Sequence, residues 1–124
     1  MRHTQRKGDI GKAMGISTFT KLGYDVATLL TESAAYDLIV DDGHELYRVQ
    51  TKYTTGKEVD LRHIHSNTKG YITKKIDKIV YDWLYIYRAD GVEFLIKNCP
   101  INQSTITPQE KDILSKVIGE NPNG

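Results

Sequence analysis

The sequence contains a single cysteine, Cys99, and no apolar run that approaches the length of a membrane span. One thiol cannot form an internal disulfide, and it excludes a zinc site built from several cysteines. The N-terminal segment MRHTQRK lacks the apolar stretch of a signal peptide. We therefore expect a cytoplasmic protein that has neither a disulfide framework nor a membrane anchor.

The composition is that of an ordinary globular chain: 124 residues, of which 39% are hydrophobic and 27% charged. This predicts one domain over residues 1–124 with one core. The net charge is only +1, but residues 24–47 carry six acids and no Lys or Arg, between two basic segments. Such an acidic segment suits a metal site flanked by phosphate-binding surfaces, and a mixed surface with clustered charges is the alternative.

Apolar periodicity and turn residues predict the order of secondary structure. A helix is expected over residues 5–22, followed by strands over 24–30, 36–40, 45–52, 58–66, 83–87 and 92–96. The segment 71–79 predicts a short basic helix, and Thr107, Pro108 and Glu110 form a capping box that starts a last helix. The expected fold class is α/β, with a mixed central β-sheet flanked by helices.

Three side chains on one predicted hairpin could carry chemistry. A turn at Asp41–His44 brings Asp37 roughly opposite Gln50, and Gln50 and Lys52 share a face because side chains alternate along a strand. Carboxylate and amide oxygens suit Mg²⁺, and a lysine can stabilise the charge of an attacked phosphate. The spacing alone is a weak signal, since Asp37 could cap a turn and Lys52 could be a solvated surface cation.

Four segments in fixed order resemble a known family. RKGDIG at residues 6–11, LGYDV at 22–26, YDLIVD at 36–41 and YRVQTK at 47–52 resemble the group I intron-associated homing endonucleases of the PD-(D/E)xK superfamily. The resemblance to the archaeal Holliday-junction resolvases is more distant. In the intron-associated group glutamine replaces the acid of the (D/E)xK pair, and Gln50 matches this replacement. The resemblance implies a restriction-endonuclease-like core.

The resemblance also assigns roles to residues. It implies Asp37 as the metal-binding acid, Gln50 as its partner, Thr51 as a backbone-carbonyl ligand and Lys52 as the catalytic lysine. The family usually has a glutamate on the first helix where this sequence has Lys12, and an ammonium there would weaken metal binding. Asp9 lies three residues earlier and could serve as a substitute ligand, or it could complement the helix N-terminus or simply be solvated.

A second group of polar residues suits contact with nucleic acid. The residues concerned are Lys7, Arg62, His63, His65, Asn67, Lys69, Lys74 and Lys75. A solvated charged face explains any one of the cations equally well. His63 and His65 lie two residues apart, but further zinc ligands are not evident, so DNA contact or packing is favoured.

The resemblance implies a homing-type DNA endonuclease that uses Mg²⁺, with Mn²⁺ as the alternative ion. Double-stranded DNA is the expected partner, and so small a protomer would need to be a homodimer or homotetramer to cut both strands. Two alternatives stay open. One is a Holliday-junction resolvase, and the other is a catalytically impaired DNA-binding module of the same fold, which Lys12 favours.

Overall fold

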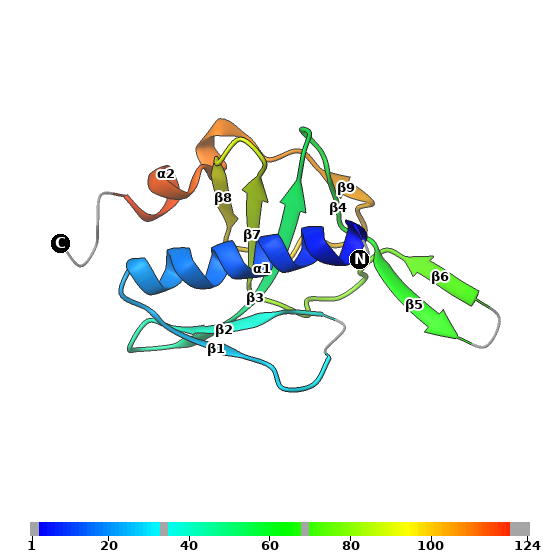
Figure 1. Ribbon diagram of the computed structural model, residues 1–124, viewed down its shortest axis with the longest axis horizontal. Helices are drawn as coiled ribbons and strands as arrows, with labels where there is room; N and C mark the ends of the chain where they lie inside the picture. Colours follow the sequence, from blue (N-terminus) through cyan, green and yellow to red (C-terminus); the bar gives the residue numbers. More distant parts are fainter. Residues whose placement is uncertain (1–2, 33–34, 68–69, 120–124) are drawn as a thin grey trace.

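A five-stranded mixed sheet forms the centre of the protein (Figure 1). The computed structural model describes residues 3–32, 35–67 and 70–119, with 3–5, 63–67 and 70–74 described by their backbone alone. The strand order is β1-β2-β3-β7-β8, with β1 (Asp25–Thr28), β2 (Leu38–Asp41), β3 (Leu46–Thr54), β7 (Trp83–Arg88) and β8 (Glu93–Ile96). β3 and β7 run parallel, whereas the other neighbours are antiparallel. The predicted α/β fold with a mixed central sheet is confirmed.

The turn between β2 and β3 fixes the register of the hairpin that carries the candidate site. Asp42 Oδ1 accepts hydrogen bonds of 2.8 Å from the backbone N–H groups of His44 and Glu45. Gly43 has a φ of 93°, a conformation that glycine adopts without steric cost. The resulting register pairs Leu38 with Val49, and the strand pairing between β2 and β3 does not extend to the residues after Val49.

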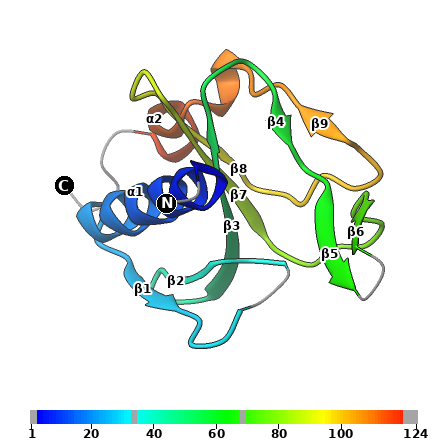
Figure 2. The ribbon, with the colours of Figure 1, turned by 45° about the vertical axis from the view of Figure 1, so that its right-hand side comes forward.

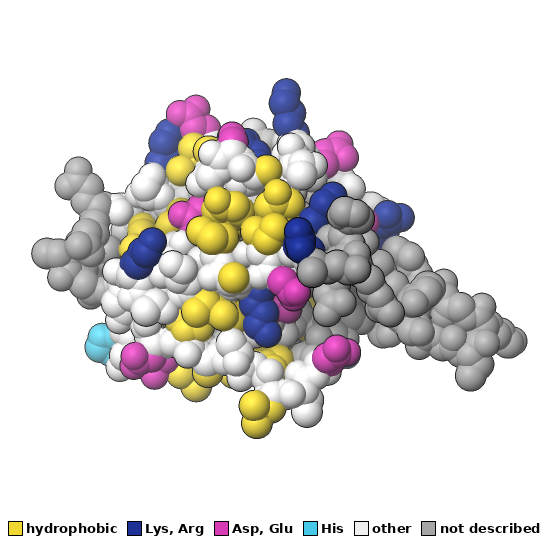
Figure 3. All heavy atoms as spheres, in the orientation of Figure 1, with side chains coloured by type: hydrophobic (Ala, Val, Ile, Leu, Met, Phe, Trp, Pro, Cys, Tyr) yellow, Lys and Arg dark blue, Asp and Glu magenta, His cyan; other side chains and the backbone are white. Residues whose placement is uncertain are grey.

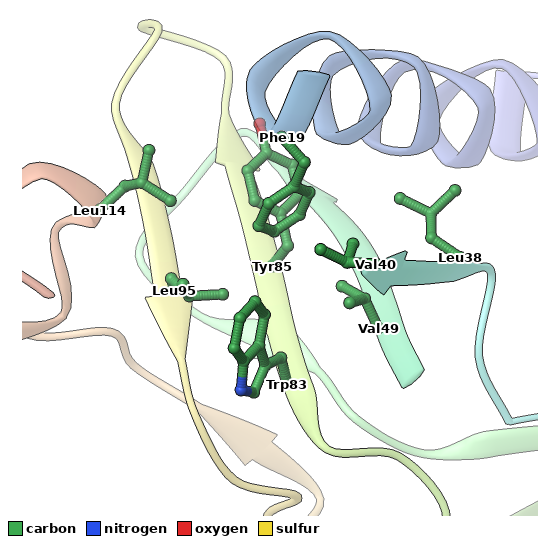
Figure 4. Close-up of a cluster of buried hydrophobic side chains, with 8 residues drawn as sticks. All are labelled: Phe19, Leu38, Val40, Val49, Trp83, Tyr85, Leu95 and Leu114. Carbon is green, nitrogen blue, oxygen red and sulfur yellow. The ribbon is translucent and has the colours of Figure 1, made fainter. Parts of the chain in front are cut away.

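The helix α1 (His3–Lys21) covers one face of the sheet (Figures 1 and 2). It approaches β3 closely because two glycines face the strand: a Cβ added at Gly11 would lie 3.0 Å from the Lys52 carbonyl carbon, and one at Gly15 would lie 3.3 Å from Thr51 Cγ2. Beneath the helix lies an apolar cluster (Figure 4). It consists of Phe19, Leu38, Val40, Val49, Trp83, Tyr85, Leu95 and Leu114.

The opposite face of the sheet carries a second apolar cluster. It consists of Val59, Leu61, Tyr81, Leu84, Ile86, Phe94, Ile96 and Cys99. Part of its cover is a two-stranded sheet of β4 (Val59–Asp60) and β9 (Thr105–Ile106), which lies on the side of the sheet away from α1 in Figure 2. Alternate residues of β7 contribute to the two clusters, so this strand is buried on both faces.

Of two predictions for the middle of the chain, one is confirmed in part and the other is wrong. The strand expected over 58–66 is divided into β4 and β5 (His63–Asn67), because the chain turns at Arg62, whose N–H donates to Asp60 Oδ1 at 2.9 Å. The helix expected over 71–79 is instead the strand β6 (Gly70–Lys74), which pairs with β5, followed by residues without regular structure. Tyr-Ile-Thr at 71–73 favours a strand once a partner is available. The hairpin β5–β6 projects from the body of the protein (Figure 1).

The C-terminal capping box is also predicted at the wrong residues. The chain forms a 3₁₀ turn, η1 (Glu110–Asp112), and a short helix, α2 (Leu114–Ile118). The capping pair is Gln109 and Asp112, whose carboxylate accepts from the Gln109 N–H at 2.8 Å. A β-bridge between Phe94 and Ile113 interrupts the helix that would otherwise start earlier. Within the described ranges, the helices are all too short or too polar to cross a membrane.

Candidate active site

A cavity of about 920 Å³ lies where β3 continues beyond the end of β2. It brings together the start of α1, the segment before β2, the second half of β3 and the segment around β4. Its lining residues are Lys7, Gly8, Asp9, Lys12, Glu32, Asp37, Gln50, Thr51, Lys52, Tyr53, Val59, Asp60 and Arg62. Side chains of both charges gather beside the N-terminal half of α1 (Figure 3).

Asp37 occupies the position where β2 begins. Its backbone N–H donates to the Val49 carbonyl at 2.9 Å, which continues the ladder between the two strands. Its Oδ2 accepts from the Thr51 N–H at 2.9 Å and from the Thr51 hydroxyl at 2.8 Å. The carboxylate is therefore held in one orientation, and Oδ1 has no hydrogen-bond partner among the described residues.

The carbonyl of Thr51 points to the same open edge as the Asp37 carboxylate. Along β3 the N–H and C=O of one residue point to one side of the strand, and successive residues alternate. The Thr54 carbonyl accepts from Ala89 N–H on the β7 side, so the backbone groups of Thr51 and Tyr53 point to the other side. There Thr51 N–H already meets Asp37, which places the Thr51 carbonyl next to this carboxylate.

Lys52 is half-buried and lines the same cavity as Asp37 and Gln50. Burial lowers the pKa of its ammonium group, and the carboxylates of Asp60 and Asp37 offset part of this decrease. The three residues predicted from the hairpin are thus brought together in space. Of the two carboxylates, Asp60 exerts the larger effect on Lys52.

Asp60 is a site residue that the sequence did not indicate. It ends β4, and the Arg62 guanidinium donates to its two oxygens at 3.1 Å and 3.0 Å. The pair with Arg62 lowers the pKa of Asp60, so the carboxylate stays ionised beside Lys52. The Asp-x-Arg spacing was the available signal, but without the turn at Arg62 it does not place either side chain near β3.

The first helix contributes Lys7, Asp9 and Lys12 to the cavity lining. Lys12 also lines an adjoining cavity of about 270 Å³, together with Glu32 and Asp37. Glu32 is a second residue that the sequence did not indicate, because it lies in the segment between β1 and β2 and outside any predicted element. Glu32 and Asp9 are both exposed.

The oxygen donors of the cavity fit a hard divalent cation. The Asp37 carboxylate, the Thr51 carbonyl and the Gln50 amide oxygen are ligand types that Mg²⁺ accepts, with water completing the shell. Within the described ranges, no three or more His, Cys, Asp or Glu side chains are grouped closely enough to hold a metal ion. A site here would therefore depend on amide and carbonyl oxygens beside Asp37, and Asp9 does not complete a cluster of three acids.

The residues predicted to contact nucleic acid fall into four groups. Lys7 and Arg62 line the cavity, and Lys75 is exposed just after β6. Lys69 lies outside the described residues. The remaining four belong to the β5–β6 hairpin, where the register pairs His63 with Lys74 and places His65 and Asn67 at alternate positions of β5.

Comparison with known proteins agrees with this architecture. Over residues 2–108 the chain matches the family described as PD-(D/E)XK endonuclease. Because the match covers most of the chain, the protein belongs to this family. It is therefore an endonuclease, and DNA is the substrate that this family implies.

The fold is similar to that of a bacterial homing endonuclease, I-Ssp6803I. The TM-score is 0.71 with 23% sequence identity, and the superposition covers 90% of this chain and 81% of that chain. A search of curated proteins returns no match. The restriction-endonuclease-like core expected from the sequence is confirmed by the family and the shared fold.

Proposed function

We propose that this endonuclease is of the homing type and hydrolyses phosphodiester bonds of double-stranded DNA with a divalent cation. The observation that carries the proposal is the orientation of Asp37. Its carboxylate is fixed by the N–H and hydroxyl of Thr51 in a cavity that also contains Gln50 and Lys52. The similarity to the fold of a homing endonuclease supports the proposed type.

In this proposal Asp37, Gln50 and the Thr51 carbonyl hold the cation, with Mg²⁺ as the expected ion and Mn²⁺ as its alternative. The bound cation supplies Lewis acidity toward the phosphate and lowers the pKa of water. The protein supplies orientation. Thr51 holds one oxygen of the Asp37 carboxylate, so the other oxygen is available to the cation. Gln50 and Lys52 lie two residues apart on β3, so the strand presents both side chains on the same face.

Lys52 is the proposed electrostatic stabiliser of the charge that develops on the attacked phosphate. Its half-buried position strengthens this interaction, because a charge shielded from water acts on its neighbours through a lower effective dielectric. Asp60, held by Arg62, lies close enough to act on the same ammonium.

Two cuts in a duplex require two active sites, so we propose a homodimer or homotetramer. Contact with the DNA flanking the cut is assigned to Lys7, Arg62 and Lys75 and to the four hairpin residues. A β-hairpin has dimensions that the major groove accepts, and β5–β6 projects from the body on the chain segment that follows Arg62 (Figure 1).

The test is cleavage of supercoiled plasmid with Mg²⁺ by wild type, Lys52→Ala and the matched control Lys57→Ala. Lys57 is an exposed lysine in the turn after β3. We expect Lys52→Ala to lower the cleavage rate by a factor on the order of 10² to 10³ while DNA binding stays within about twofold, and Lys57→Ala to cleave normally. Full cleavage by Lys52→Ala refutes the assignment.

Two outcomes would redirect the proposal. Preferential cutting of four-way junctions over linear duplex would identify a Holliday-junction resolvase. Binding without cleavage in both Mg²⁺ and Mn²⁺ would identify a DNA-binding module, an alternative that the ammonium of Lys12 in the cavity supports.

A further inference from the structure

Among the described residues, Lys12 has no partner for its charge, although it lines a cavity that contains many oxygen atoms. Its side chain is half-buried, and it forms no ion pair or hydrogen bond with any described residue. It lines both the main cavity and the adjoining one, and Asp37 lines both as well. The two groups nevertheless do not form an ion pair, so a space separates the ammonium from the carboxylate.

The position of Lys12 is fixed by the packing of its helix. The preceding residue, Gly11, contacts the backbone of β3 so closely that a Cβ there would lie 3.0 Å from the Lys52 carbonyl carbon and 3.1 Å from its oxygen. Because α1 is held against β3 at this point, the backbone of Lys12 cannot move away from the cavity without displacing the helix. The cavity thus has ammonium groups on two separate elements, Lys12 on α1 and Lys52 on β3.

An ammonium group that lines a cavity without an anionic partner is available to an incoming anion. A DNA phosphate is such an anion, and its oxygens accept charge-assisted hydrogen bonds from lysine. Four carboxylates, those of Asp9, Glu32, Asp37 and Asp60, line the cavity, and none of them forms an ion pair with Lys12.

We propose that Lys12 binds a backbone phosphate of the DNA strand that enters the cavity, so that a cation of α1 holds the strand while Lys52 on β3 stabilises the charge that develops on the attacked phosphate. This assignment rests on the proposed function and adds a substrate-binding residue to it. Lys12 then contributes to affinity before any cation is bound, whereas Asp37, Gln50 and Thr51 act on the cation.

The experiment measures binding of a short fluorescent duplex by anisotropy, without divalent cation, over a series of salt concentrations. The proteins are wild type, Lys12→Ala, Lys12→Arg and the matched control Lys21→Ala, an exposed lysine at the far end of the same helix. One lost phosphate contact lowers the slope of log K against log salt by about 0.9. The ratio of the Kd of Lys12→Ala to that of wild type should therefore fall by about 3.5-fold for each fourfold rise in salt.

We expect Lys12→Arg and Lys21→Ala to keep the wild-type slope. A slope for Lys12→Ala equal to that of Lys21→Ala overturns the assignment of Lys12 alone, since wild type still binds DNA. Absence of DNA binding by wild type at low salt overturns the proposed function and this assignment together. Cleavage that rises in Lys12→Glu would also overturn it, because a carboxylate would then serve better than a phosphate-binding ammonium at this position.

Discussion

The contact between Gly11 and β3 can be tested with two alanine substitutions in one helix. Gly8 and Gly11 both lie inside α1, but a Cβ at Gly8 meets nothing within 4 Å, whereas one at Gly11 would lie 3.0 Å from the Lys52 carbonyl carbon and 3.3 Å from Tyr53 N. The contacted atoms belong to the backbone of a central strand. They cannot yield as the end of a flexible side chain would.

The two substitutions should change the stability of the protein in opposite directions. Replacing glycine by alanine inside a helix gains about 0.5–1 kcal/mol from backbone entropy and propensity. Gly8→Ala should keep this gain. At Gly11 the added methyl group also forces the helix away from the strand, and overpacking of this kind costs about 1–3 kcal/mol. The net effect of Gly11→Ala is a loss of roughly 0.5–2 kcal/mol.

Thermal unfolding followed by circular dichroism measures both variants. With about 4 °C of Tm per kcal/mol for a chain of this size, Gly8→Ala should raise the Tm by roughly 2–4 °C, and Gly11→Ala should lower it by roughly 2–8 °C. The reasoning is refuted if Gly11→Ala is as stable as Gly8→Ala, because α1 would then not be in close contact with Lys52.

Two further predictions concern polar groups. Asp82 accepts hydrogen bonds from the Arg48 N–H at 2.8 Å and from the Arg48 guanidinium at 3.2 Å, and the two residues are 34 positions apart. Asp82→Ala should therefore cost roughly 1–2 kcal/mol after allowance for partial exposure, which is more than Asp90→Ala should cost, because the ion pair of Asp90 lies within a local turn. Because Arg48 lowers the pKa of Asp82, the contribution of this pair to stability is complete above the ordinary pKa of 3.8 and disappears as the pH falls through the lowered pKa. Urea unfolding of wild type and Asp82→Ala at pH 7 and pH 3 should show a smaller difference at pH 3, and a difference independent of pH would contradict the prediction. The Tyr81 hydroxyl is buried without a hydrogen-bond partner among the described residues, whereas the Tyr85 hydroxyl donates at 2.5 Å to the carboxylate of Glu93 on β8. Tyr81→Phe should therefore have a Tm at or above that of wild type, and Tyr85→Phe should have a lower Tm. Equal destabilisation by the two tyrosine substitutions would show that the Tyr81 hydroxyl has a partner after all.

Elements encoded by neighbouring residues could be predicted from the sequence. The helix over 5–22 corresponds to α1, and the predicted hairpins correspond to β2–β3 and β7–β8. In each hairpin the turn contains a glycine with positive φ, Gly43 or Gly91, which determines where the chain reverses. Such turn signals are local, and they fixed the register that brings Asp37 to Gln50 and Thr51.

Elements that depend on a distant partner could not be predicted in the same way. The two residues of β9 form a strand only because they pair with β4, more than forty positions earlier. The segment at 71–74 contains lysine and aromatic or β-branched residues, and pairing with β5 decides in favour of a strand. Asp60 and Glu32 were missed as cavity residues for the same reason, since tertiary packing brings them to β3.

The start of β2 explains why a local hairpin signal was sufficient to bring three of the candidate residues, Asp37, Gln50 and Lys52, to one cavity. β2 begins only at Leu38, so Thr51 on β3 has no strand residue opposite its N–H, and an unpaired backbone group near the core is costly. The Asp37 carboxylate takes the place of the missing ladder acceptor. The same bond that completes the backbone pairing of β3 therefore aims the acid at the cavity, next to the Thr51 carbonyl. A change that lengthened β2 by two residues would pair Thr51 with backbone and release Asp37, which would remove the site while leaving the sheet intact.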